Sequence, residues 1–257
     1  MNLRRPRTVL AIFLVALTTV VATAFAQGRR GRRFSGDITV EQNPRYDGRF
    51  AFVRLRYQGY GCMSNEGPGW MHDYPIAERN LMKILGELTA LQPRLDSSYV
   101  LDTDDPELMR HPIAYLSEPG CWRPTESEVT GLQQYLQKGG FLIVDDFRGQ
   151  HWYNFAEVMS RVLPGLQFVE LDVTNPVFQS MLGIETLDLS EPNYGGRSLF
   201  MGLYEDNDPA KRLLVVANYN NDIGDYWQWS AEGFLPIPLT NEAYKLGVNY
   251  IMYGFSH

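Results

Sequence analysis

Apolar residues recur along this chain with two different periods, and these periods alternate from about residue 49 to the C-terminus. Residues 49–58 (RFAFVRLRYQ) alternate apolar and polar side chains, which predicts a strand covered on one face. Residues 74–91 place apolar side chains three and four positions apart, which predicts an amphipathic helix. Strands that alternate with helices predict right-handed crossovers and a mainly parallel sheet with helices on both faces.

The clearest helix signal lies between Pro124 and Gly140. Thr125 is the predicted N-cap, and Glu128 is its partner in a capping box. Gly139 and Gly140 are expected to end the helix. Its apolar stripe consists of Val129, Leu132 and Leu136.

Residues 139–147 (GGFLIVDDF) predict a strand that is buried on both faces, because an uninterrupted apolar run follows the two glycines. Asp145 and Asp146 would then lie at the C-terminal tip of this strand. Open α/β sheets bind their ligands at that edge. The two acids are therefore the first candidates for a functional site.

The predicted fold class is α/β, flavodoxin-like or Rossmann-like, with a single domain over residues 49–257. Residues 170–212 fit this pattern least well, because they are richer in proline, glycine and asparagine. We interpret them as an inserted irregular region with antiparallel strands or long loops near the ligand crevice. Further strands and helices are predicted over 97–105, 113–116, 154–165, 166–172, 175–182, 198–205, 212–220 and 240–255.

The first 26 residues have the organisation of a secretory signal peptide. Three arginines precede the apolar run TVLAIFLVALTTVVATAFA, which ends in the small-residue pattern Ala24-Phe25-Ala26. We predict cleavage after Ala26 and export to the periplasm or the medium. The alternative is a retained anchor, since an apolar run of about 19 residues nearly spans a bilayer.

Residues 27–48 are predicted to be a flexible, basic leader that contains the stretch GRRGRRFSG. Its alternative role is a contact with anionic lipid or polysaccharide. Removal of the signal peptide leaves 20 basic and 30 acidic residues, a formal charge of −10. This acidic balance argues against nucleic acid as a partner. A small molecule, a saccharide or an envelope protein is compatible with it, and membrane contact is expected only through an uncleaved signal or the leader.

Three ordered segments carry a resemblance to a known family: GLQQYLQKGGFLIVDDF at 131–147, NYNNDIGDYWQW at 218–229 and EAYKLGVNYIMYGF at 242–255. They resemble the bacterial family of domains of unknown function numbered 4159 (DUF4159). The resemblance implies a class I glutamine amidotransferase-like fold and a place in the cell envelope, but no activity. In amidotransferases the equivalent strand ends in a nucleophilic cysteine, whereas Asp145 or Asp146 occupies that place here. A thiolate is the group that attacks the amide, so glutamine hydrolysis is not expected.

Asp145 and Asp146 have three possible roles: general base, metal ligand, or cap for the next helix and its loop amides. Neighbouring strand residues point to opposite faces, so we expect at most one of them to face the crevice. His151 lies five residues after Asp146 and is a candidate partner in the same loop. The alternative for His151 is a solvated loop histidine.

The loop GYGCMSNEGPGWMHDY at 59–74 is longer than the usual connection between a strand and a helix. His72 is a further catalytic candidate in this loop. Trp70 and Tyr74 are ligand-binding candidates, because aromatic side chains in a long loop at this edge could form the wall of a pocket. The alternative is that they pack the loop onto the domain.

Asp222 and Asp225 follow the predicted strand 212–220 and are candidate ligands at the same edge. The spacing lacks the 12-residue frame of an EF-hand, so an ordered turn held by Asx bonds is the alternative. Trp227 and Trp229 lie two residues apart and could form a stacking platform for a sugar or peptide. They could equally belong to the core.

Nucleotide-binding and hydrolase motifs are missing from the sequence, including G-x-G-x-x-G, the P-loop, H-E-x-x-H, C-x-x-C and G-x-S-x-G. No organic cofactor is therefore predicted. A divalent metal is the alternative, and the sequence assigns it no ligand set.

Cys62 and Cys121 are the only cysteines. Export to an oxidising compartment would favour their pairing in a disulfide. The strands that precede them are expected to be neighbours in a flavodoxin-type sheet, which would bring their tips within disulfide reach. The alternative is a nucleophilic Cys121.

The sequence supports three hypotheses for function. The first is an exported, non-catalytic or ligand-sensing α/β domain of the cell envelope. The second is a hydrolase that uses Asp145 or Asp146 with His72 or His151, with or without a divalent metal, on an envelope polysaccharide or peptide. The third is a structural interaction module with aromatic loops as its partner face. Convergence of carboxylates and imidazoles from separate loops would favour the enzyme.

Overall fold

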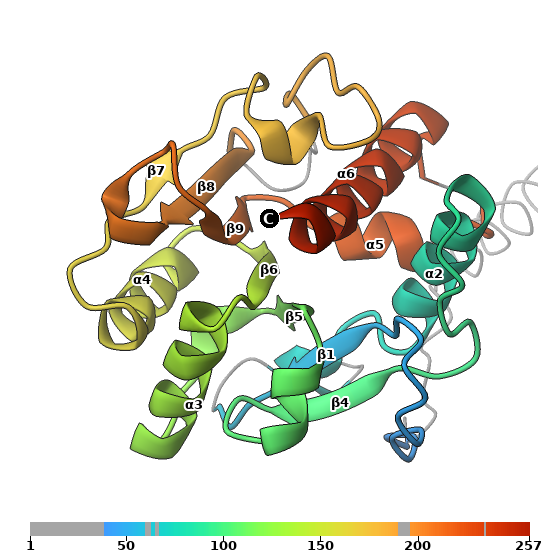
Figure 1. Ribbon diagram of the computed structural model, residues 1–257. Helices are drawn as coiled ribbons and strands as arrows, with labels where there is room; N and C mark the ends of the chain where they lie inside the picture. Colours follow the sequence, from blue (N-terminus) through green and yellow to red (C-terminus); the bar gives the residue numbers. More distant parts are fainter. Residues whose placement is uncertain (1–38, 60–62, 65–66, 190–195, 234) are drawn as a thin grey trace, which may run out of the picture. The chain divides into compact units, whose positions relative to one another are not determined.

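The computed structural model describes residues 39–59, 63–64, 67–189, 196–233 and 235–257 (Figure 1). Within these residues the chain forms a seven-stranded sheet in the order β4-β1-β5-β6-β9-β8-β7 and a two-stranded sheet of β2 and β3. The strands are β1 (Val53–Arg56), β2 (Met63–Ser64), β3 (Gly67–Pro68), β4 (Tyr99–Asp102), β5 (Ile113–Ser117), β6 (Phe141–Phe147), β7 (Val169–Glu170), β8 (Leu199–Tyr204) and β9 (Leu213–Tyr219). The α-helices are α2 (Ile76–Leu88), α3 (Glu126–Gln137), α4 (His151–Val162), α5 (Ile223–Gln228) and α6 (Ile237–Ser256). Short 3-10 helices are η1 (Gly69–Met71), η2 (Pro106–Arg110), η3 (Pro119–Cys121), η4 (Pro176–Phe178) and η5 (Glu205–Asn207).

The main sheet is mostly parallel. Strands β4, β1, β5, β6 and β9 run in one direction, β8 pairs antiparallel with β9, and β7 pairs antiparallel with β8. The predicted α/β, flavodoxin-like or Rossmann-like class is confirmed. The antiparallel strands expected around residues 170–212 are also present, and they form one edge of the sheet.

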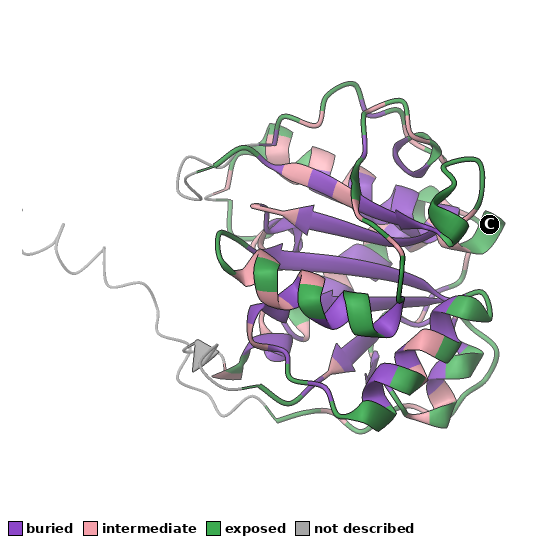
Figure 2. Ribbon diagram, turned by 90° about the vertical axis from the view of Figure 1, so that its left-hand side faces the viewer, coloured by how far each residue is buried: buried purple, intermediate pink, exposed green. Residues whose placement is uncertain are grey.

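Helices cover both faces of the sheet (Figure 1). Helices α3 and α4 pack on one face, against apolar side chains of β1, β5, β6 and β9. Helices α2, α5 and α6 pack on the other face. Figure 2 shows the resulting burial: the central strands are buried along their length, and the helices are exposed on their outer sides.

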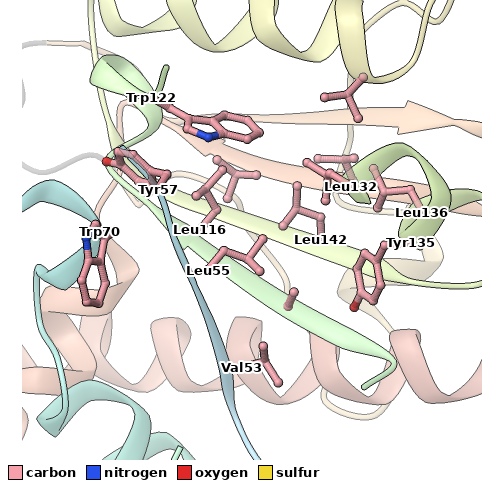
Figure 3. Packing of buried hydrophobic residues seen from close by; sticks show 14 of the residues in the cluster. Val53, Leu55, Tyr57, Trp70, Leu116, Trp122, Leu132, Tyr135, Leu136 and Leu142 are labelled. Carbon is pink, nitrogen blue, oxygen red and sulfur yellow. The ribbon is translucent and has the colours of Figure 1, made fainter. Parts of the chain in front are cut away.

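The core on the α3 side is formed by side chains of neighbouring strands. Figure 3 shows Leu55, Leu116 and Leu142 of β1, β5 and β6 near Leu132 and Leu136 of α3. All of these leucines are completely buried. Such burial is worth roughly 1.5 to 3 kcal/mol for each side chain, so these contacts hold the strands in place beneath the loops at their ends.

Helix α3 begins and ends where the sequence predicts. The Thr125 Oγ1 accepts a hydrogen bond from the backbone N–H of Glu128, and the Glu128 carboxylate accepts one from the N–H of Thr125 at 2.7 Å. These reciprocal bonds form the predicted capping box. Gly139 follows the helix with φ of +115°, a conformation that residues with a Cβ rarely adopt.

Strand β1 differs from the prediction of a strand covered on one face. Arg54, a polar position in the alternating pattern, has no exposed surface. The strand lies between β4 and β5, and its polar face is covered by α2 and the loop before it. The alternating pattern predicted the wrong exposure for Arg54, because the charge of this residue is neutralised by Glu78 and not solvated by water.

Three helices also differ in their limits or existence. An ordered turn is the alternative expected for Asp222 and Asp225, whereas the structure has the short helix α5 there, with Asp222 as its N-cap. Helix α4 begins at His151 rather than near Asn154, and α6 begins at Ile237 rather than Thr240. The early start of α4 places His151 on a helix instead of in a loop.

Part of the predicted leader is bound to the domain. The Asn43 side chain donates to the carbonyl of Val100 at 3.0 Å and accepts from its N–H at 2.8 Å. Val100 lies in the edge strand β4, so Asn43 satisfies backbone groups that an edge leaves open. Arg94 adds a hydrogen bond to the carbonyl of Arg45 at 2.8 Å. Residues 39–48 therefore extend along the sheet edge.

The predicted signal peptide lies outside the described residues, as does Cys62, so the predicted disulfide stays a prediction. Nearby backbone geometry is compatible with it: Gly59 forms a bridge with Trp122, and Arg123 N donates to the carbonyl of Gln58 at 2.9 Å. Among the described helices, none combines the length and apolar character needed to cross a membrane.

Candidate functional site

Acidic side chains and a histidine converge at the edge of the sheet where the parallel strands end. The imidazole of His72 and carboxylate oxygens of Asp146 and Asp222 lie within 4.8 Å of one another. The same limit holds for His72, Asp73 and Asp225. We call these five residues the Asp/His cluster. They come from three segments that are far apart in the sequence.

Asp146 pairs directly with His72. The His72 Nδ1 lies 2.6 Å from Oδ2 of Asp146. The side chains are 20% and 9% exposed, respectively, so water can reach both. The pairing of β6 with β9 is irregular between Val144 and Phe147, and Asp146 has φ of +55°. This local break turns the Asp146 carboxylate toward the loop that carries His72.

Asp145 points into the protein instead. Its Oδ2 accepts hydrogen bonds from the Tyr115 hydroxyl and the Gly224 N–H, both at 2.9 Å. Its Oδ1 accepts from Asn218 Nδ2 at 3.0 Å and from the Ile223 N–H at 3.3 Å. The Asp145 side chain, near the end of β6, therefore holds the N-terminus of α5. The structure places Asp145 as a structural anchor and Asp146 as the acid that faces the cluster.

Burial raises the pKa of Asp145 to about 7, and the negative charge of Asp146 acts in the same direction. Hydrogen bonds from Gly224, Asn218 and Tyr115 oppose the rise. The Asn218 amide is itself fixed by the Tyr250 hydroxyl, which donates to Asn218 Oδ1 at 2.8 Å. A polar network thus continues from the cluster into α6.

Asp73 lies against the first turn of α5. It is fully buried, with φ of +66°. A Cβ atom on Gly224 would lie 2.4 Å from Asp73 Oδ2 and 2.9 Å from the Tyr115 hydroxyl. Position 224 therefore requires glycine, because any side chain would displace Asp73 from α5.

Asp222 and Asp225 belong to α5 itself. Asp222 is the N-cap, and its Oδ1 accepts from the Asp225 N–H at 2.9 Å. Asp225 Oδ1 accepts from Trp229 Nε1 at 3.1 Å. The Asx bond predicted from the sequence is present, and it begins a helix that directs both acids to the cluster.

Acidic groups outnumber the basic group at the site, and their crowding favours the protonated forms of the buried acids. Burial raises the pKa values of Asp73, Asp222 and Asp225, and the charge of Asp146 raises each of them further. His72 is the cluster's cationic partner: burial lowers its pKa, but the bond to Asp146 and the surrounding acids outweigh this and raise it to about 11. One imidazolium faces four carboxylates in the cluster. The site favours binding of protons or of a cation.

Four of the six non-glycine residues with positive φ in the described part of the chain lie at this edge, whereas Asp206 and Asn207 belong to η5. Asp73, Glu118, Asp146 and Asn220 have φ of +66°, +46°, +55° and +56°. Each lies in or beside a connection at the carboxyl ends of the parallel strands. Residues with a Cβ seldom adopt such angles, and they occur preferentially at functional sites. This is a second, independent indication that the edge has a role beyond folding.

The other predicted site residues lie elsewhere. His151 is the first residue of α4 and packs on Gly120, where a Cβ would lie 2.2 Å from its Cγ. Within the described residues, the groups with metal-ligand spacing contain His72 and not His151. The cooperation of His151 with Asp146 stays a prediction.

The aromatic candidates are largely core residues. Trp227 is fully buried, and its Nε1 donates to the carbonyl of Ala243 at 3.0 Å, so it cannot be half of an exposed stacking platform. Trp70 and Tyr74 are 5% and 2% exposed. Their burial favours the alternative that they pack the loop onto the domain.

Two residues near the site were missed by the sequence analysis. Glu118 follows β5, and its negative charge contributes to the raised pKa of His72. The available signal was its place at the end of an apolar run, immediately before Pro119-Gly120. Arg54 lies beneath the loop, and its Nη1 donates to the carbonyl of His72 at 2.8 Å. Only its alternation with apolar neighbours was visible in the sequence.

Fold and site together define an α/β protein of the doubly wound class with an acidic, histidine-containing site at the carboxyl edge of its sheet. The chain belongs to the family described as Domain of unknown function (DUF4159), whose sequence profile matches residues 51–255. The match contains the whole Asp/His cluster. No curated protein matches the chain. The family description assigns no molecular function, so the function has to be inferred from the site.

Proposed function

We propose that this chain is an exported protein of the bacterial cell envelope that binds a divalent cation in the Asp/His cluster. The convergence of His72, Asp146 and Asp222 within 4.8 Å of one another carries the proposal. Export rests on the signal-peptide pattern of residues 1–26. We also propose that the doubly wound sheet is related to the class I glutamine amidotransferase fold, with Asp146 in the place of the nucleophilic cysteine.

The chemistry of the donors favours a hard cation. Carboxylates with a single imidazole suit Mg²⁺, Mn²⁺ or Ca²⁺ better than a thiolate-seeking metal. His72 would bind the cation as a neutral imidazole, so binding displaces the proton that the raised pKa otherwise keeps on the ring. Burial and repulsion between neighbouring acids raise the pKa values of Asp73, Asp222 and Asp225. A bound cation would stabilise the ionised forms of these acids and so offset both effects. His72, Asp146 and Asp222 form one possible ligand set, and His72, Asp73 and Asp225 form the other.

Calorimetric titration of the purified protein with MnCl₂, MgCl₂ and CaCl₂ tests this proposal. We expect saturable binding of at least one of these cations, with a Kd on the order of micromolar. Asp222→Asn should weaken binding at least about 100-fold without loss of the fold, because asparagine is also a good N-cap. Asp104→Asn, at an exposed acid that belongs to neither possible ligand set, is the matched control and should bind like the wild type. Heats of dilution alone for the wild type, or equal affinity in both variants, would refute the cation site.

A second candidate function is hydrolysis of an envelope polysaccharide or peptide. The observation that favours it is the left-handed conformation of Asp146 at the tip of β6, with His72 at 2.6 Å. A strained acid paired with an imidazole at this edge is a suitable general base, and a bound cation would lower the pKa of a water molecule. The convergence of acids and imidazole from separate loops also favours an enzyme over a structural module.

Incubation with purified peptidoglycan in the presence of Mn²⁺ distinguishes the hydrolase from a ligand-sensing domain. A hydrolase is expected to release new reducing ends or free amino groups, and Asp146→Asn should reduce the rate at least about 100-fold. The same release by the variant would assign the activity to a contaminant. If the wild type binds the cation but releases neither product, peptidoglycan is not its substrate, and the result favours a ligand-sensing role for the site.

A further inference from the structure

Arg54 connects the sheet to the loop that presents the Asp/His cluster. Its side chain has no exposed surface, and its Nε and Nη2 donate to the two carboxylate oxygens of Glu78 at 2.7 and 3.0 Å. The remaining nitrogen, Nη1, donates to the backbone carbonyls of Trp70 at 3.1 Å and His72 at 2.8 Å. The guanidinium therefore joins β1, α2 and the loop through one planar group.

The arrangement is more specific than a buried ion pair needs to be. Glu78 alone neutralises the charge of Arg54. The bonds to the two carbonyls fix the loop at the turn that precedes Asp73. The Arg54 Cζ also lies 5.0 Å from the centre of the Tyr115 ring, and the Tyr115 hydroxyl donates to Asp145. Arg54 thus contacts the loop that carries His72 and also the Tyr115 ring, which is hydrogen-bonded to Asp145. Arg54 itself is not a member of the cluster.

We infer that Arg54 is the positioning residue of the Asp/His cluster: its guanidinium fork fixes the backbone of residues 70–72, so that His72 meets Asp146 and Asp73 reaches α5. The effect on cation affinity rests on the proposed function, whereas the effect on the loop does not. Lysine carries the same charge but lacks the planar fork, so it can bond Glu78 or the carbonyls but not all of them in this geometry. Arg54→Lys therefore isolates position from charge.

Arg56 provides a matched control on the same strand. It makes a bidentate pair with Asp102 at 2.8 and 2.7 Å, but its side chain is 43% exposed and contacts no part of the cluster in the bonds described. Arg56→Lys repeats the chemical change without touching the loop. A difference between the two variants in amide exchange or Mn²⁺ affinity therefore measures the effect of the hydrogen bonds from Arg54 to the carbonyls of Trp70 and His72.

Hydrogen–deuterium exchange of the cation-free protein gives the first readout. In Arg54→Lys we expect amides of the segment 70–77 to exchange at least about 10-fold faster, while those of β6 keep their wild-type rates. Arg56→Lys should match the wild type in both segments. Unchanged exchange in 70–77, or an equal rise in β6 that signals general destabilisation, would overturn the inference.

Mn²⁺ binding gives the second readout, which a merely structural role would not change. Affinity should fall about 10- to 100-fold in Arg54→Lys, as for other residues that orient metal ligands. In the electron spin echo spectrum of bound Mn²⁺, coupling to a ring nitrogen of His72 reports that the imidazole is a ligand. We expect this coupling to disappear in Arg54→Lys and to persist in Arg56→Lys. Full affinity and intact coupling in Arg54→Lys would overturn the inference. If the wild type binds none of Mn²⁺, Mg²⁺ and Ca²⁺, the proposed function fails, and the exchange data alone decide the role of Arg54.

A paired variant keeps the test valid if Arg54→Lys does not fold. Arg54→Met with Glu78→Met removes both charges together, which avoids an unpaired buried charge. We expect this protein to fold and to show the same rapid exchange in 70–77. Wild-type exchange in that segment would show that the carbonyl bonds of Arg54 are dispensable.

Discussion

Asp145→Ala is expected to lower the free energy of unfolding by about 4 kcal/mol, one of the two largest effects we predict for a single substitution. The carboxylate accepts hydrogen bonds from Tyr115, Asn218 and the first amides of α5 in the interior. Alanine leaves all of these donors without an acceptor and adds a cavity. Differential scanning calorimetry should show Tm lower by about 10 °C.

The adjacent acids provide a matched comparison. Asp145→Asn replaces one acceptor oxygen with an N–H group that faces other donors, and we expect a loss of about 2 kcal/mol. Asp146→Asn should change stability by no more than about 0.5 kcal/mol. Its side chain is reached by water, and relief of the repulsion on Asp73 and Asp222 offsets the loss of the ion pair with His72. Equal melting temperatures for the two asparagine variants would contradict the assignment of Asp145 as anchor and Asp146 as site residue.

Asn249→Ala is expected to destabilise the protein by about 3 kcal/mol, for a different reason. Asn249 is fully buried in α6, and its Oδ1 accepts from the amides of Met181 at 3.0 Å and Leu182 at 2.8 Å. Its Nδ2 donates to the carbonyls of Phe178 at 2.8 Å and Leu182 at 2.7 Å. The irregular segment around η4 has little regular structure of its own, so this side chain supplies its polar attachment to α6.

Limited proteolysis alongside thermal unfolding measures this effect. Asn249→Ala should lower Tm by about 6 to 12 °C and expose the segment 173–189 to cleavage. Asn241→Ala, an exposed position on the same helix, is the control and should leave both properties unchanged. Wild-type stability of Asn249→Ala would mean that the apolar anchors Val177 and Phe178 hold the segment without help from the amide.

The sequence predicts the fold well where the signals are local. The apolar runs of β6 and β9 indicate buried strands, and the Thr125 and Glu128 pair marks the start of α3. Helix α5 was missed because six residues are too few for an apolar stripe, and its N-cap Asp222 also fits a turn. Trp227 was ambiguous for a related reason, since burial of a tryptophan depends on what packs over it.

The candidate site was predicted in part. Asp146 and His72 were both candidates, but nothing in the sequence shows that they meet, because the contact depends on a break in β6 and a left-handed backbone at Asp146. The sequence does not predict the role of Arg54, because a charged residue in an alternating strand is expected to face solvent unless its partner is known. Glu78, that partner, lies on another element. Long-range pairs of this kind follow from topology and not from sequence spacing.

Anomalous diffraction from crystals grown with MnCl₂ tests the central claim most directly. The account predicts a manganese peak inside the Asp/His cluster, with carboxylate oxygens of Asp146 and of Asp222 or Asp225 at about 2.0 to 2.6 Å and the imidazole of His72 in the same coordination shell. Crystals of Asp222→Asn should show a weaker peak or none. A well-diffracting wild-type crystal with no peak in the cluster, or with peaks only at surface acids, would contradict a cation site at this edge of the sheet.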